Sequence, residues 1–318
     1  MRLVWVCFFL SLCAGLGAAS AAGLPVAARA LVFKSKALEI SVRYPQTANR
    51  AIDAALADYA RASVDAFKTY GPDAAANGDR PYALDTTYSI ARNDGAMFAV
   101  LFTIYEDTGG AHPNGDYATF DFLLPGGAQV FLPEIIDGSR GLTRVSRLVA
   151  ADLLRRIGSG ADALSDKDTI ARGTAPVADN FKDFVWEPGR LHIYFPPYQV
   201  AAYAAGPQES ILPLDRLREV IRPDWRAPAP SFDCAKAATG IETAVCADAA
   251  LARLDRQVAE AWQSAMRNAY EPAAQAKLRQ EQRDWLARRN AACRGPAPGA
   301  CLVKVYRDRL AVLTRPPV

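Results

Sequence analysis

The chain has 318 residues and a formal net charge of +3, a length that suggests two domains. Residues 231–318 hold 14 Lys/Arg against 9 Asp/Glu, a net charge of +5, and residues 22–230 hold 22 against 25, a net charge of −3. Neither part carries a dense basic stripe, which argues against a surface for nucleic acid.

The first 22 residues have the pattern of a secretory signal peptide. Arg2 supplies positive charge, and Leu3 to Gly17 form an uncharged apolar run. The run is about fifteen residues long, below the roughly 18 to 20 that span a bilayer. Ala19-Ser20-Ala21 then offers the small residues that signal peptidase accepts, so we expect cleavage after Ala21 or Ala22. No other long apolar run follows. The mature protein is therefore expected in the periplasm or outside the cell, without a membrane span.

This expectation has a direct test. The intact mass of the exported protein should show the loss of 21 or 22 residues, because cleavage follows Ala21 or Ala22. A mature protein that keeps Cys7 and Cys13, with or without lipid, would contradict the assignment.

The cysteines that remain after cleavage lie in the last quarter of the chain. They are Cys234, Cys246, Cys293 and Cys301. In an oxidising compartment they are expected to form disulfides, which small domains often need. Four cysteines allow three pairings. We favour the local one, Cys234–Cys246 with Cys293–Cys301, because a short capped segment joins the first two and a Pro/Gly-rich turn joins the others. The competing pattern joins Cys234 or Cys246 to Cys293, since antiparallel helices can bring those ends together.

A proline-rich segment at 223–231 separates two parts with different patterns. Residues 23–222 are expected to form an α+β domain, an antiparallel sheet with helices. Residues 232–318 are expected to form a small all-α domain stapled by the disulfides.

Strands of the first domain are indicated by alternating apolar residues at 38–44, 82–90 and 97–106. Helical spacing of apolar residues follows at 52–70 and 142–157. The alternation of the two patterns indicates a meander of strands with helices inserted between them.

Three turn sequences divide these strands into hairpins. Asn93-Asp94-Gly95 is a strong hairpin signal, Pro125-Gly126-Gly127 lies between TFDFLL and QVFL, and Pro188-Gly189 lies within residues 184–194. Each is expected to connect two antiparallel strands.

The last domain shows helical signals throughout. Thr239 and Glu242 have the spacing of a capping box, and Asp248 is a good N-cap for the helix that follows. That helix has an apolar face made of Leu251, Leu254, Val258, Trp262 and Met266. Glu271-Pro272 interrupts it before a second helix that runs towards Cys293, and a third helix follows the Pro/Gly-rich loop. We expect a helical hairpin with a third helix docked on it.

Residues suited to catalysis are scarce. The two histidines, His112 and His192, have no metal-ligand spacing, and the cysteine spacings fit no zinc pattern. No nucleophile elbow, P-loop or dinucleotide-binding glycine motif occurs. We therefore expect no enzyme activity, no cofactor and no metal.

Two polar loops are the candidates for binding. The first, Glu106 to Tyr117, is rich in glycine and lies between two strong strands; it is either a plain hairpin turn or a recognition loop on a rigid sheet. The second, Phe195 to Gln208, holds tyrosines that can be core or contact residues. The candidate binding residues are Glu106, Asp107, Gly109, Gly110, His112, Asp116, Tyr198 and Tyr203. The three acids of the first loop would attract a cationic partner.

Motifs at these loops resemble a known family. Residues 105–112 read Tyr-x-x-x-Gly-Gly-Ala-His, FDFLLPGGAQVFLPEII follows, and Pro197-Tyr198 and residues 203–207 complete the pattern. Residues 30–222 thereby resemble the domain shared by the lysozyme-sensing anti-sigma factor RsiV and the peptidoglycan deacetylase PdaC. The resemblance implies an extracytoplasmic domain, which in the anti-sigma factor binds lysozyme.

The last domain resembles a second family. The matching elements are FDC at 232–234, Glu242 with Cys246, LARLD at 251–255, QRDWLARRNAAC at 282–293 and CLVKVYRDRLAVL at 301–313. Their order and spacing resemble the N-terminal domain of the lysozyme inhibitor LprI, which implies a disulfide-stapled helical module.

These observations together predict an exported, non-enzymatic binding protein that binds and inhibits lysozyme. The alternative is a cell-wall module that binds peptidoglycan or assists a peptidoglycan enzyme. A glycan hydrolase is disfavoured by the missing catalytic patterns.

Overall fold

A computed structural model describes residues 23–77, 80–158, 164–226, 229–269, 271–295 and 298–313. The predicted signal peptide, with Cys7 and Cys13, lies outside the described residues. No helix among the described residues is long and apolar enough to cross a membrane.

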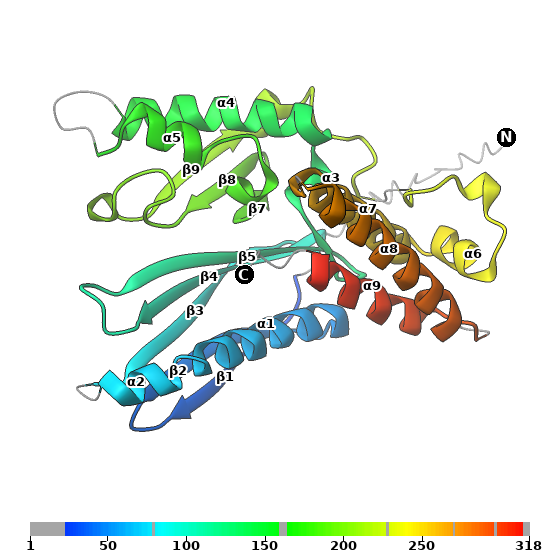
Figure 1. The fold of residues 1–318 in the computed structure, drawn as a ribbon. Coiled ribbons are helices and arrows are strands. Elements are labelled where there is room, and N and C mark those ends of the chain that lie inside the picture. Colours follow the sequence, from blue (N-terminus) through cyan, green and yellow to red (C-terminus); the bar gives the residue numbers. More distant parts are fainter. Residues whose placement is uncertain are drawn as a thin grey trace, which may run out of the picture.

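A six-stranded sheet forms the centre of the first part, with its strands in chain order (Figure 1). The strands are β1 (Ala27–Lys34), β2 (Leu38–Gln46), β3 (Tyr82–Asn93), β4 (Met97–Asp107), β5 (Asn114–Leu123) and β6 (Ala128–Val130). The hairpins predicted at Asn93-Asp94-Gly95 and at residues 125–127 are confirmed, since β3–β4 and β5–β6 are antiparallel. The sheet is not wholly antiparallel, because β2 and β3 run parallel. The two helices that join β2 to β3 return the chain to the end of the sheet where β2 begins. The two strands therefore run in the same direction.

Helix α1 (Arg50–Lys68) covers one face of this sheet, and the short α2 (Gly71–Asn77) follows it. Phe98, Val100 and Phe102 of β4 point to that face and pack with Ile52 and Leu56 of α1, all fully buried. Burial of each such side chain stabilises the fold by roughly 1.5 to 3 kcal/mol. The Asn49 side chain caps α1 by accepting hydrogen bonds from the first turn.

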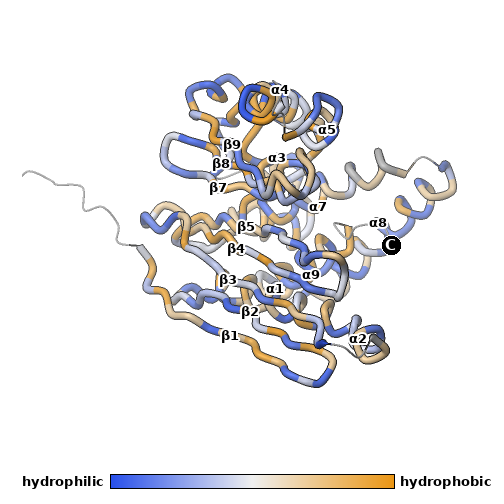
Figure 2. Tube along the Cα trace, turned by 90° about the vertical axis from the view of Figure 1, so that its left-hand side faces the viewer, coloured by the Kyte–Doolittle hydropathy of each residue, from blue (hydrophilic) through white to orange (hydrophobic). Residues whose placement is uncertain are grey.

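Strand β1 lies at the edge of the sheet and is exposed along almost its whole length. Its hydrophobic residues are visible at the rim of the molecule in Figure 2. Its ladder with β2, from Ala27↔Gln46 to Lys34↔Glu39, therefore holds it in place more than burial does.

A second layer stands over the opposite face of the sheet (Figure 1). It contains α3 (Leu132–Ile135), α4 (Gly138–Ile157), α5 (Lys167–Gly173), β7 (Phe184–Glu187), β8 (Arg190–Phe195) and β9 (Gln208–Pro213). The hairpin predicted at residues 188–189 is confirmed by the β7–β8 ladder. Short 3-10 helices lie at Ala178–Phe181, Tyr203–Ala205, Leu214–Leu217 and Cys234–Lys236.

Two side chains of β5 join the layers by accepting hydrogen bonds from the backbone of β7. Thr119 Oγ1 accepts from Phe184 N at 2.8 Å, and Asp121 Oδ1 accepts from Trp186 N at 2.9 Å. The two sheets thus lie close together at β7, and satisfied backbone N–H groups fix that approach.

The last part is all-helical, as predicted, with α6 (Gly240–Ala247), α7 (Ala249–Asn268), α8 (Pro272–Ala292) and α9 (Gly299–Leu313). The capping box of Thr239 with Glu242 is present, and Asp248 caps α7. The disulfides are the local pair, Cys234–Cys246 and Cys293–Cys301.

The helices pack against the first part through buried polar contacts. Arg253 of α7 forms an ion pair with Glu134 of α3 at 3.3 Å, and both side chains are only 2% exposed. Trp225 of the proline-rich segment is buried against Trp186, with ring centroids 5.6 Å apart. The domain boundaries at 222 and 232 remain a prediction, but Trp225 in the segment between them contacts both parts, through the Trp186 ring and through Arg253 of α7.

Candidate functional site

The two loops singled out in the sequence meet at one end of the molecule. The tip of the β4–β5 hairpin carries His112, and the β8–β9 connection carries Tyr198 and Tyr203. The imidazole of His112 stacks on the Tyr203 ring, with centroids 3.8 Å apart, and the Tyr198 and Tyr203 rings lie 5.5 Å apart. Three residues from two separate loops of the chain therefore form one aromatic cluster.

Hydrogen bonds fix the orientation of these rings. His112 Nδ1 lies 3.0 Å from the carbonyl oxygen of Pro113, which can only accept, so Nδ1 carries the proton. His112 Nε2 then accepts from the Tyr198 hydroxyl at 2.9 Å. The Tyr203 hydroxyl donates to the same Pro113 carbonyl oxygen at 2.8 Å. Each polar end of the cluster has a partner, which holds the rings in a single arrangement.

Tyr198 has a backbone conformation that is unusual for a tyrosine. Among the described residues it is the only non-glycine residue with positive φ, at 73°. The amide of Gln199 donates to the carbonyl oxygen of Pro196, so Pro197 and Tyr198 are the central residues of a turn. A turn with proline first and positive φ second normally has glycine in the second place, and another residue there costs about 1 kcal/mol or more. The Tyr198 side chain is nevertheless 58% exposed.

The connection that carries Tyr198 is anchored to its own layer. The Gln199 side chain donates to the carbonyl oxygens of Gly173 at 3.0 Å and of Asn180 at 2.9 Å. Val200 beside it is fully buried. Gly173 permits this contact, because a Cβ there would lie 2.0 Å from the Gln199 carbonyl oxygen. The exposed tyrosine is therefore presented by a loop that packing holds rigid.

A groove of about 370 Å³ opens beside the cluster, between the sheet and the second layer. Thr103, Tyr105 and Tyr117 line it from the strands, and Pro197, Tyr203 and Pro207 line it from the loop. Tyr105 is 44% exposed. Residues that carry aromatic rings and hydroxyl groups thus line the groove, a surface that suits either a protein or a sugar.

The acids of the hairpin do not form the single exposed group that was expected. Asp107 is buried, accepts from the Gly109 amide at 3.0 Å, and pairs with Arg80 at 3.0 Å. Its carboxylate closes the turn, where Gly109 supplies a positive φ of 77°. The assignment of Asp107 as a binding residue remains a prediction. Gly110 is exposed in the same turn.

Glu106 and Asp116 remain available to a partner. Asp116 is exposed and Glu106 is half-buried on the neighbouring strand. Burial raises the pKa of Glu106, and the charge of Asp116 raises it further. Neither carboxylate forms an ion pair with any described residue, so a cationic partner would relieve their repulsion.

A second polar cluster extends the site, and the sequence reading did not predict it. His192 Nε2 lies 2.8 Å from Glu209 Oε2, and its Nδ1 lies 3.3 Å from Glu187 Oε1 and 3.0 Å from the Tyr194 hydroxyl. Burial and the charges of Glu187 and Glu209 raise the pKa of Tyr194. The Tyr117 ring, 5.5 Å from that of Tyr194, connects this cluster to the groove. Arg190, His192 and Tyr194 alternate along β8 and so share one face of the strand. This alternation was the one sign of the cluster that the sequence offered.

Comparison with known proteins divides the chain into three matched segments. Residues 234–313 match the family model described as lysozyme inhibitor LprI. Residues 32–115 match deacetylase PdaC, and residues 131–215 match a protein family of unknown function, DUF3298. His112 and Tyr198 therefore come from segments that two different models match. Both resemblances noted in the sequence are confirmed.

Two curated relatives are identical to this chain at about a quarter of the aligned residues. The peptidoglycan-N-acetylmuramic acid deacetylase PdaC of Bacillus subtilis is 26% identical over 196 residues, 61% of this chain and 41% of that protein. An esterase of Mycobacterium tuberculosis is 27% identical over 166 residues, 50% of this chain and 71% of that protein. The chain thus spans about two-fifths of the length of the deacetylase.

Two solved structures of the DUF3298 family are similar in part. The protein from Bacteroides fragilis has a TM-score of 0.48 at 15% identity, covering 64% of this chain and 95% of that one. The protein from Pseudomonas aeruginosa has a TM-score of 0.45 at 12% identity, covering 64% and 96%.

Proposed function

We propose that this protein is exported, is not an enzyme, and binds and inhibits lysozyme through the cluster of His112, Tyr198 and Tyr203. Two matches support the proposal. The helical part matches a family described as a lysozyme inhibitor, and the first part matches a deacetylase whose name places it on peptidoglycan, the polymer that lysozyme cleaves. One segment thus resembles a protein named for its action on peptidoglycan, and the other resembles a family named for inhibiting lysozyme, which cleaves peptidoglycan.

The conformation of Tyr198 is the observation that carries the choice of site. The fold keeps a large aromatic residue at a position that favours glycine, yet leaves its side chain 58% exposed. Burial of the Tyr198 ring itself does not compensate for that strain, and strained exposed residues concentrate at binding sites. Tyrosine is also enriched among the residues that dominate the energy of protein interfaces.

The charge around the cluster supports a cationic partner such as c-type lysozyme. Glu106 and Asp116 lie on adjacent strands at the end of the hairpin, on the face of the sheet that α1 covers rather than on the groove face, and Glu209 on β9 has a side chain that is 58% exposed. Acidic groups beside a binding surface raise the rate at which a cationic protein associates. The helical part, with its net charge of +5, would attract such a partner less.

Charge reversal tests this site. Glu106→Lys with Asp116→Lys should raise the concentration needed for half-inhibition of lysozyme at least tenfold, because about 1.4 kcal/mol of lost attraction corresponds to a factor of ten. Stability should change by no more than about 0.5 kcal/mol, since neither carboxylate has an ion-pair partner in the described part of the chain. A turbidity assay on purified cell walls measures inhibition, and thermal unfolding measures stability.

The matched control is Asp58→Lys with Asp65→Lys on α1. Both side chains are over 70% exposed and form only surface ion pairs, with Arg61 and Lys68. This variant has the same change in charge and should inhibit like the native protein. Unchanged inhibition by the Glu106/Asp116 variant would remove the hairpin from the mechanism and favour the helical part.

Tyr198→Gly separates binding from folding. Relief of the positive φ stabilises the variant by about 1 kcal/mol, and loss of the hydrogen bond to His112 destabilises it by about the same amount. The free energy of unfolding should therefore change by less than about 1 kcal/mol, while inhibition weakens at least tenfold as an interface tyrosine is lost. Tyr70→Gly, at an exposed tyrosine away from the groove, should leave inhibition intact. Normal inhibition by Tyr198→Gly would exclude Tyr198 from the interface.

The second candidate function is binding of peptidoglycan glycan. It is favoured by the groove, where the rings of Tyr105, Tyr117 and Tyr203 lie beside the Thr103 hydroxyl. Sedimentation with insoluble peptidoglycan, without inhibition of lysozyme, would establish this function in place of the first. Release of acetate or soluble fragments from purified walls would contradict the assignment as a non-enzyme.

A further inference from the structure

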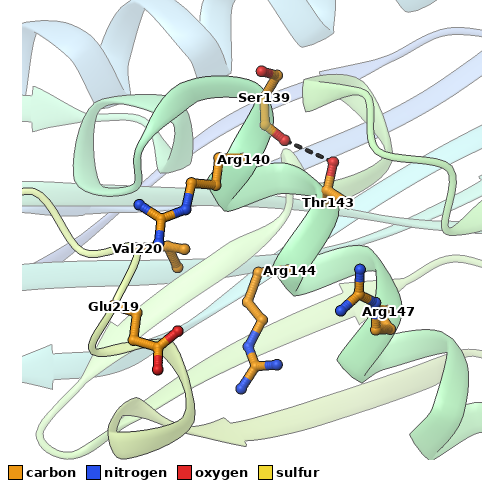
Figure 3. Close-up of a pocket in the computed structure, with 7 residues that line it drawn as sticks. All are labelled: Ser139, Arg140, Thr143, Arg144, Arg147, Glu219 and Val220. Carbon is orange, nitrogen blue, oxygen red and sulfur yellow. Dashed lines mark hydrogen bonds between the residues drawn. The ribbon is translucent and has the colours of Figure 1, made fainter.

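The first half of α4 carries three arginines along one face, away from the aromatic cluster. Arg140, Arg144 and Arg147 line a pocket of about 380 Å³ together with Ser139, Thr143, Glu219 and Val220. Figure 3 shows the three arginine side chains on one side of the helix and Glu219 across from them. The spacing of four and three residues places the three arginines on one face of the helix.

Their charges are poorly compensated within the protein. Arg147 has no hydrogen-bond or ion-pair partner among the described residues. Arg144 donates through Nε to the Arg216 carbonyl oxygen at 3.1 Å, and its Nη groups have no hydrogen-bond partner in the part of the chain that the structure describes. Arg140 approaches Asp137 only to 3.7 Å, with both side chains more than half exposed. Glu219 is not within ion-pair distance of any described cation, so it neutralises none of the three.

The position of these arginines is also unfavourable for the helix. The N-terminal end of a helix is the positive end of its dipole and favours anions, but the first turn of α4 contains no acidic residue. Like charges three and four residues apart repel each other on the helix surface. The Asp137 side chain accepts no capping hydrogen bond, so the first amide N–H groups, those of Ser139 and Arg140 included, have no acceptor within the helix. The arrangement destabilises the free protein and favours an anion.

We infer that this pocket binds the phosphate group of a larger ligand. Guanidinium groups bind phosphate oxygens through paired, charge-assisted hydrogen bonds, and amide groups at a helix N-terminus add further donors. Ser139 supplies a hydroxyl beside them, while the Thr143 hydroxyl is occupied by the Ser139 carbonyl oxygen at 2.8 Å. The pocket is open at the surface, so the rest of the ligand can extend away from it. The inference rests on residues that the lysozyme site does not use, and neither depends on the other.

The test measures binding of inorganic phosphate and pyrophosphate to the full mature protein by calorimetry. Arg144→Gln with Arg147→Gln should weaken binding roughly tenfold or more, because charge-assisted hydrogen bonds are lost. The control, Arg279→Gln with Arg288→Gln, removes two exposed arginines from α8 and should bind as the native protein does. Thermal unfolding establishes that both variants are folded.

Vesicles of equimolar phosphatidylglycerol and phosphatidylcholine distinguish the source of the phosphate. Sedimentation with these vesicles, lost in the Arg144/Arg147 variant, would assign a lipid headgroup. Binding of phosphate without binding of vesicles would assign a water-soluble phosphate ester or polymer. Failure of the native protein to bind phosphate or pyrophosphate, or equal weakening in the control variant, would overturn the inference.

Discussion

Replacing Arg253 with methionine is expected to lower the free energy of unfolding by about 3 to 5 kcal/mol, the loss typical of a buried ion pair that loses one partner. Arg253 Nη1 donates to Glu134, and Nη2 donates to the carbonyl oxygens of Trp225 at 2.7 Å and Arg226 at 2.8 Å. Methionine fills the space but leaves the Glu134 charge and both carbonyl groups buried without this donor. Because Arg253 belongs to α7, the helices should also separate more easily from the first part.

The loss should depend on pH. Burial raises the pKa of Glu134 from 4.5 to about 7, and Arg253 is the strongest opposing influence. A carboxyl group with a raised folded pKa contributes stability that is present below about pH 4.5 and is lost as the pH rises through about 7. Without Arg253 the pKa rises further, so the loss continues to higher pH. The deficit of Arg253→Met should thus be larger at about pH 8 than at about pH 5.5.

Chemical denaturation of four proteins tests this account. Glu134→Gln with Arg253→Met should be more stable than Arg253→Met alone, because no buried charge remains, and its deficit should vary less with pH. Glu134→Gln by itself completes the double-mutant cycle. Equal stability of Arg253→Met and the native protein at pH 8 would show that the ion pair does not hold the helices in place.

Removing the disulfides is the second change with a large expected effect. The bridges span 12 and 8 residues of sequence, so the entropy of loop closure gives each about 2.5 to 3 kcal/mol, slightly less for the shorter Cys293–Cys301 loop. The difference in burial is expected to outweigh this difference in loop length, so that loss of the Cys293–Cys301 bridge costs more stability. Cys293 is 2% exposed within the core that contains Trp285 and Tyr306, whereas Cys234 is exposed. Loss of packing adds about 1 kcal/mol to the Cys293–Cys301 deletion.

Urea unfolding of paired alanine variants measures both effects. Cys293→Ala with Cys301→Ala should be the less stable pair, and both pairs together should lose about 6 to 7 kcal/mol. Peptide mapping without reduction should recover Cys234 linked to Cys246. A peptide that links Cys234 to Cys293, or free thiols at all four positions, would contradict the pairing, and a larger loss from the Cys234–Cys246 deletion would contradict the argument from burial.

The candidate site was predictable in part. His112, Tyr198 and Tyr203 were identified because polar loops with glycine, proline and aromatic residues are visible in the sequence, and the fold brings all three together. The burial of Asp107 was not predictable, because the sequence gives no sign that Arg80, 27 residues away, would pair with it. The His192 cluster was missed because Glu187 and Glu209 belong to the strands on either side of β8. The sequence of one strand does not show which residues of its neighbours lie beside it.

Local physics was enough to predict the turns, the caps and the class of each part. Asn93-Asp94-Gly95 turns a hairpin, Thr239 and Glu242 cap a helix, and the apolar stripe of α7 turns towards a core, because each depends on residues within one or two turns of chain. Strands β1 and β9 were not predicted. β1 is exposed along almost its whole length and is held by its hydrogen bonds to β2. β9 is held in the same way by its antiparallel pairing with β8.

Tertiary structure alone decided the contacts between distant segments. The parallel pairing of β2 with β3, the hydrogen bonds from β5 that attach the second layer, and the ion pair between Glu134 and Arg253, 119 residues apart, all join groups with no local relation. The strain at Tyr198 also depends on distant contacts. The sequence shows only a Pro-Tyr pair. The anchoring of the loop through Gln199 and the hydrogen bond to a histidine from another hairpin hold that tyrosine at a φ of 73°. Sequence determines such sites only through the whole fold, because the free energy that offsets local strain comes from contacts made elsewhere in the chain.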